Sequence, residues 1–151
     1  MIKRIFQPRE QRMSVSVILL LLRLAMGIAF IMHGWMKIQT PFSWVPPQAP
    51  MHIPSFFQFL AAISEFGGGI TLVLGFLIPL SSFGLISTMA VAVYTTIVTF
   101  NAPFVNNSGG PSFELPSIYF LLAAMFFIMG PGKYSLDRII FGERKRSTLV
   151  Q

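Results

Sequence analysis

The chain has 151 residues, of which 54% are hydrophobic and only 11% charged, with a net charge of +6. Soluble domains carry about 25% charged residues, so this composition excludes a soluble globular protein and indicates one integral membrane domain. The absence of cysteine excludes disulfides, thiolate metal sites and thiol nucleophiles.

Four apolar runs are long enough, or nearly long enough, to cross a bilayer of about 30 Å as helices. They cover residues 13–34, 56–78, 80–100 and 115–129. The last run is short, so either Glu114 and Pro116 lie within its first turn or it sits slightly tilted at the interface. After it, a short amphipathic helix is expected over residues 136–141, with Ser135 as its cap. The sequence therefore predicts an all-α, four-helix membrane bundle.

The positions of the basic residues predict the orientation of this bundle. Nine lysines and arginines lie before the first run or after the last, whereas the two long loops carry only Lys37. By the positive-inside rule, both termini are expected to be cytoplasmic. The net charge of +6 is then explained by the orientation of the chain in the membrane and by contact of the tails with anionic lipid. Nucleic-acid binding is not expected, because the basic residues lie in two short tails without interleaved aromatic residues.

Two charged residues, Arg23 and Glu65, lie inside apolar runs. Each is about 13–14 Å along its span, and consecutive spans run antiparallel, so the two are expected to meet near mid-membrane. Such charges usually face a partner or a cavity. The alternatives are that Arg23 reaches the headgroups alone, or that the pair only holds the bundle together.

Residues three or four apart share a helix face, which gives the other candidates for an intramembrane polar pocket. The candidate site residues are Arg23, Phe30, His33 and Lys37 on the first span, Gln58, Glu65 and Phe76 on the second, and Glu114 at the start of the fourth. Glu65 and His33 are the candidate catalytic residues, passing protons, and the others are expected to bind ligand. The alternatives are a structural hydrogen bond for His33 and solvated surface roles for Lys37 and Glu114.

Metal and haem sites are not expected. A bis-histidine haem would have to use His33 and His52, the only histidines, and His52 lies in a proline-rich loop. A di-iron bundle needs several inward-facing carboxylates and histidines at one level, and only Glu65 lies deep. The chain therefore supplies no redox-active group of its own, and no covalently bound cofactor is expected.

Three motifs in order resemble a known family. RL-x-x-G followed by HG-x-x-K runs from Arg23 to Lys37, Glu-x-x-Gly-Gly begins at Glu65, and GPG-x-x-SLD follows the last span. This order, over residues 17–140, resembles the DoxX family of small four-helix bacterial and archaeal membrane proteins. The family is named for its likeness to a membrane subunit of thiosulfate:quinone oxidoreductase. The resemblance implies a multi-pass protein of the bacterial inner membrane linked to quinone or to redox partners.

The expected function is a membrane subunit of a redox complex whose polar pocket binds a quinone or similar amphipathic molecule. In that role Arg23 would bond a quinone oxygen, while Phe30 and Phe76 would pack against the ring. The alternatives are a non-catalytic scaffold or partner subunit with a structural Arg23–Glu65 pair and, less favoured, a small transporter. The expected partners are the lipid bilayer and a redox protein, and a homo-oligomer is compatible with the sequence.

Overall fold

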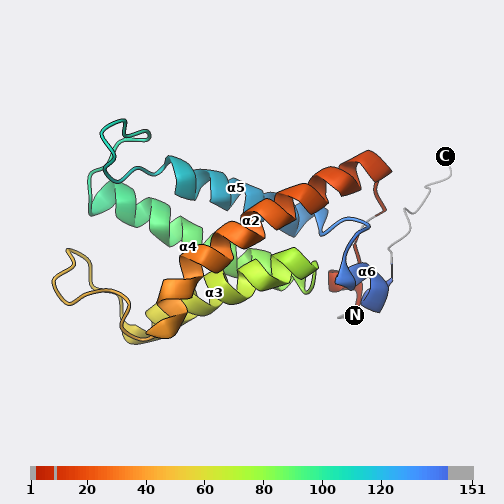
Figure 1. Ribbon diagram of the computed structural model, residues 1–151, viewed down its shortest axis with the longest axis horizontal. Coiled ribbons are helices and arrows are strands. Elements are labelled where there is room, and N and C mark those ends of the chain that lie inside the picture. The colour runs from red at the N-terminus through yellow and green to blue at the C-terminus, as the bar shows by residue number, and fades with distance from the viewer. Residues whose placement is uncertain (1–2, 9, 143–151) are drawn as a thin grey trace.

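The computed structural model describes residues 3–8 and 10–142, whose path is shown in Figure 1. Secondary structure within these residues is entirely helical. The helices are α1 (Lys3–Phe6), α2 (Met13–Gln39), α3 (Ser55–Leu74), α4 (Ile78–Val98), α5 (Glu114–Met129) and α6 (Leu136–Phe141). Three of them are long and apolar enough to cross a membrane, and α5 is a shorter apolar helix. The predicted all-α membrane bundle is confirmed.

Each long helix packs against the next one in the chain: α2 on α3, α3 on α4 and α4 on α5. Figure 1 shows the loops of residues 40–54 and 99–113 at one end of the elongated bundle, with α1, α6 and the α3–α4 turn at the other. We call these the loop end and the terminal end. The residues before α2 and after α5 thus lie at the same end.

Glycines set how closely α2 and α3 approach. A Cβ atom added at Gly34 would lie 2.5 Å from the backbone nitrogen of Phe66, and one at Gly27 would lie 2.8 Å from the carbonyl oxygen of Gly69. Any side chain at these positions would push the backbones apart. The small residues therefore allow tight packing of the two helices and fix their register.

The interior is filled by apolar side chains from α2, α3, α4 and α5. The buried cluster comprises Leu19, Met26, Phe30, Leu72, Ile78, Leu85, Met89, Ala123 and Phe126. Large apolar side chains such as Met32 and Leu121 are exposed on the outer faces. Apolar residues both inside and outside are the pattern of helices that face lipid.

The helix ends differ from the predicted spans by more than two residues in two places. α2 continues past residue 34 to Gln39, because Pro41 is the first helix breaker in that segment. α3 ends at Leu74 rather than near residue 78, because Gly75 adopts the left-handed conformation (φ 68°) and reverses the chain. α6 has the predicted bounds, with the Ser135 side chain accepting a hydrogen bond from the backbone nitrogen of Arg138. The short helix α1 was not predicted.

Candidate functional site

Arg23 does not pair with Glu65, so the expected central ion pair is wrong. The Arg23 side chain is 1% exposed and turns toward the terminal end. Its Nη1 donates to the carbonyl oxygen of Pro131 at 3.0 Å, and its Nη2 donates to that of Tyr134 at 2.7 Å. Its Nε–H is buried without a partner in the described part of the chain. Arg23 therefore fastens α2 to the segment that follows α5.

The register of α2 against α3 explains this correction. The glycine contacts place Gly34 beside Phe66, and an added Cβ at Gly75 would collide with the Arg23 guanidinium. Arg23 is therefore level with Gly75, ten residues beyond Glu65 on α3, which corresponds to about 15 Å along a helix. The expected pairing assumed equal depths for the two charges, and the close glycine packing forbids that register.

Asp137 of α6 is a structural residue that reasoning from spans alone did not identify. Its carboxylate accepts hydrogen bonds from the backbone nitrogens of Leu77 (2.8 Å) and Ile78 (3.0 Å), and its own nitrogen donates to the Gly75 oxygen at 3.0 Å. Burial raises the pKa of Asp137 above its usual range, opposed by these backbone hydrogen bonds and by the positive charge of Arg23. The SLD of the GPG-x-x-SLD motif was its only signal in the sequence.

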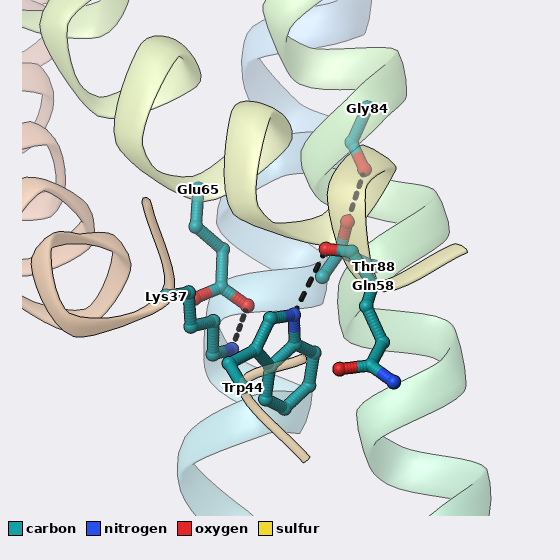
Figure 2. Close-up of polar contacts among 6 residues, drawn as sticks. All are labelled: Lys37, Trp44, Gln58, Glu65, Gly84 and Thr88. Carbon is teal, nitrogen blue, oxygen red and sulfur yellow. Dashed lines mark hydrogen bonds and ion pairs between the residues drawn. The ribbon is translucent and has the colours of Figure 1, made fainter. Parts of the chain in front are cut away.

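Glu65 instead pairs with Lys37, near the loop end. The Lys37 Nζ lies 2.6 Å from Oε1 of Glu65, and the two side chains are 25% and 3% exposed. The Lys37 ammonium also lies 4.5 Å from the centre of the Trp44 ring, a cation–π contact. Figure 2 shows the Trp44 indole beside the ion pair. A charge pair covered by an aromatic ring is thus built from α2, α3 and the loop between them.

Gln58 holds that loop in place. Its Oε1 accepts from the backbone nitrogen of Val45 at 2.9 Å, and its Nε2 donates to the oxygen of Ile53 at 2.8 Å. The Trp44 Nε1 donates to the main-chain oxygen of Gln58 at 2.9 Å, as Figure 2 shows. Gln58 therefore supports the loop over the ion pair and does not line the cavity beneath it.

A cavity of about 160 Å³ lies in the loop half of the bundle, lined by residues of α2, α3, α4 and α5. Its lining residues are Phe30, His33, Lys37, Glu65, Met89, Ala92, Leu115, Pro116 and Tyr119. Four of the predicted site residues, namely Phe30, His33, Lys37 and Glu65, are brought together here. The cavity is therefore apolar over most of its wall, with a few polar groups on one side.

Tyr119 is the one polar residue lining this cavity that was not among the predicted site residues. Its ring contacts those of Phe30 and His33, with centroids 5.0 Å and 6.3 Å away. Within the described residues, neither the Tyr119 hydroxyl nor the His33 ring has a hydrogen-bond partner. A polar aromatic residue in the first turns of an apolar helix was its only signal, and such residues are also common at membrane interfaces.

The other predicted site residues lie elsewhere. Arg23 and Phe76 are near the terminal end, where the Phe76 nitrogen donates to the Thr71 oxygen at 2.9 Å. Glu114 begins α5, with its backbone nitrogen 3.0 Å from the oxygen of Phe104, and its neighbour Leu115 reaches the cavity. The described residues contain no group of three or more potential metal ligands.

Comparison with known proteins places the chain in a family. A family model described as DoxX matches residues 18–98, from α2 to the end of α4. The chain belongs to the DoxX family. It is also 30% identical over 128 residues to the inner membrane protein YqjF of Escherichia coli (strain K12), covering 80% of this chain and 90% of that protein. No solved structure matches. The DoxX match includes Lys37 and Glu65, whereas Tyr119 and Asp137 lie beyond it.

Proposed function

We propose that this DoxX family member binds the single-ring head of a quinone, or a similar amphipathic molecule, in the cavity beside Lys37 and Glu65. The volume of about 160 Å³ carries the proposal. An apolar protein cavity of about 150 Å³ holds one benzene molecule. One six-membered ring therefore fits, whereas a flavin or a haem does not.

The polar groups of the cavity suit an uncharged ligand with oxygen atoms. Lys37 and Glu65 neutralise each other at 2.6 Å, so the pair adds no net charge. His33 and Tyr119 have no hydrogen-bond partner in the described chain and can each donate to a ring oxygen or accept from a ring hydroxyl. Phe30 provides a flat apolar wall on which a ring can pack.

Access to the cavity is from the lipid. Leu115, which lines the cavity, is 46% exposed, and His33 is also exposed. These residues lie on α5 and α2, two helices that touch through the rings of Phe30, His33 and Tyr119. On the loop side, Trp44 covers the ion pair. A molecule dissolved in the bilayer can therefore reach the cavity between α2 and α5.

In the cell, we infer a role at the bacterial inner membrane, the location named for the Escherichia coli relative, with the terminal end facing the cytoplasm. Electrons would come from a redox partner, because the chain has no redox group. His33 and Glu65 are then the groups placed to pass protons to the bound ring.

A substitution that fills the cavity tests the proposal. Ala92→Leu adds apolar volume to the cavity wall, whereas Ala90→Leu makes the same change on the exposed, outward face of α4. Binding of a short-chain benzoquinone to the purified protein would be measured by a shift in thermal unfolding. We expect at least a tenfold loss of affinity for Ala92→Leu and parental affinity for Ala90→Leu.

Mass spectrometry of lipids extracted from the natively purified protein identifies the bound molecule. A co-purified quinone supports the proposal. An empty cavity, equal affinities for the two leucine variants, and stoichiometric copurification of another subunit would instead favour the scaffold alternative.

A further inference from the structure

Exposed apolar side chains gather on the terminal cap, which we define as residues 3–8 and 130–142. Ile139 and Ile140 of α6 are 78% and 53% exposed, and Ile5 of α1 is 62% exposed. The rings of Phe6 and Phe141 stack with centroids 5.4 Å apart, which joins the two short helices. The cap therefore presents three large aliphatic side chains on two short helices that pack against each other.

The cap is held firmly on the bundle. The Gln7 Nε2 donates to the Phe141 oxygen at 2.9 Å. Asp137 binds the start of α4, and Arg23 binds the backbone between α5 and α6. The Gln7 bond joins the two parts of the cap. Because the bundle holds both ends of the 131–137 segment, the exposed isoleucines just after it keep a fixed height relative to the spans.

This apolar surface continues that of the spans. α1 contacts α4, whose first turns expose Leu80 and Phe83, each by 61%. Ile128, at the end of α5, is 62% exposed. Figure 1 shows α6 just beyond the ends of these helices. The cap therefore continues the exposed apolar surface of the spans beyond the start of α4 and the end of α5.

Charge around the cap is basic. Arg12 is exposed, and Lys133 and Arg138 are partly exposed, whereas Glu10 is the exposed acidic residue nearby and Asp137 is buried. The sequence continues with Glu143 and three basic residues within 144–146, outside the described residues. Apolar side chains flanked by cations are the pattern of elements that lie in an anionic membrane surface.

We propose that the terminal cap lies in the headgroup layer of an anionic phospholipid leaflet, with Ile5, Ile139 and Ile140 reaching the acyl-chain boundary. The chain has no cysteine, so single cysteines can carry a spin label without background. Labels at Ile139→Cys and Ile5→Cys would be measured in vesicles of phosphatidylcholine alone and of equal parts phosphatidylcholine and phosphatidylglycerol.

Two further positions calibrate the measurement. Leu121→Cys, on the outer face of α5, marks the hydrocarbon, and Asn107→Cys, in an exposed loop, marks water. In the mixed vesicles, we expect the ratio of oxygen to nickel-chelate accessibility at Ile139 and Ile5 to exceed that at Asn107 several-fold and to stay below that at Leu121. A ratio equal to that at Asn107 would overturn the proposal.

The lipid class is tested by the same labels. We expect both cap positions to lie deeper in the vesicles that contain phosphatidylglycerol than in phosphatidylcholine alone. Equal depths in the two would overturn the assignment to anionic lipid. Neither result depends on whether the cavity binds a quinone.

Discussion

Lys37 and Glu65 form an ion pair across α2 and α3, with Nζ 2.6 Å from Oε1 and the Glu65 side chain only 3% exposed. The pair lies at the wall of the cavity and beneath Trp44. Its partners are 28 residues apart in the chain, and both are polar groups that an apolar helix would otherwise leave unsatisfied. The pair therefore contributes to the helix contact and to the polarity of the cavity together.

Removing one partner of this pair is expected to be more harmful than removing both. Lys37→Met leaves Glu65 buried and unpaired, which costs about 3–5 kcal/mol in soluble proteins and less in lipid, where water defects relieve the charge. Lys37→Met with Glu65→Leu replaces the pair by apolar contacts, so we expect the unfolding temperature of this double variant to be closer to that of the parent. Thermal unfolding of the parent, Lys37→Met, Glu65→Leu and the double variant in detergent measures the coupling. Additive effects would show that the two residues do not interact.

The tight contact between α2 and α3 predicts opposite outcomes for two Gly→Ala substitutions. Gly34→Ala places a methyl group against the Phe66 backbone, whereas a Cβ at Gly67 has nothing nearer than Ile63 at 3.9 Å. We expect Gly34→Ala to lower the unfolding temperature clearly. Gly67→Ala should leave it unchanged or raise it slightly, because alanine favours a helix by about 0.5–1 kcal/mol over glycine. Similar losses in both variants would argue against the glycine contact.

Asp137 is expected to make stability depend on pH. Its pKa is raised in the folded protein, so the folded state holds more protons than the unfolded state between the ordinary value of about 3.9 and the raised value. Its contribution is thus fully present below the unfolded pKa and is lost as pH rises through the folded pKa. Asp137→Asn removes this titration while the other carboxyl groups are unchanged.

The measurement compares unfolding temperatures of the parent and Asp137→Asn at several pH values between 4 and 7, a range chosen around that ordinary value. We expect the parent to gain stability relative to the variant as the pH falls. A constant difference across the range would show that Asp137 does not titrate there. Asp137→Asn also weakens the contact with Leu77 and Ile78. This loss lowers the unfolding temperature of the variant by a similar amount at every pH.

The orientation of the bundle is tested by labelling in intact cells. Single cysteines at Glu10 and Asn107, both exposed, lie at opposite ends of the bundle. With the terminal end in the cytoplasm, an impermeant maleimide should label Asn107→Cys and spare Glu10→Cys until the cells are opened. The reverse labelling pattern would show that the bundle has the opposite orientation in the membrane.

The sequence predicted the bundle well because each span is determined by local composition. Long apolar runs have no other stable arrangement in a membrane than helices whose backbone groups bond internally. The bounds differed most at the end of α2, which continues until the first proline, and at Gly75, where the left-handed backbone ends α3. Which charges pair, by contrast, depends on the register of α2 and α3. That register is set by the approach of Gly34 to Phe66, a contact between residues distant in sequence.

The candidate site was predicted only in part, because the sequence shows which residues share a helix face but not how the helices pack. His33, Lys37 and Phe30 recur on one helix face and therefore lie together in the cavity, and Glu65 joins them from the next helix. Arg23 shares their face but lies too far along the helix. Tyr119 could not be identified, because its place opposite Phe30 follows from the packing of α5, which no motif in the sequence encodes.

The bonds of Arg23 to the oxygens of Pro131 and Tyr134 impose an order on biogenesis. The ribosome makes Arg23 more than one hundred residues before its acceptors, so the first span meets the membrane with a guanidinium whose partners do not yet exist. The native contacts of Arg23 can therefore form only after the fourth span has been made. A nascent chain stopped after the third span lacks both acceptor oxygens, so α2 is not yet fastened to the segment that follows α5.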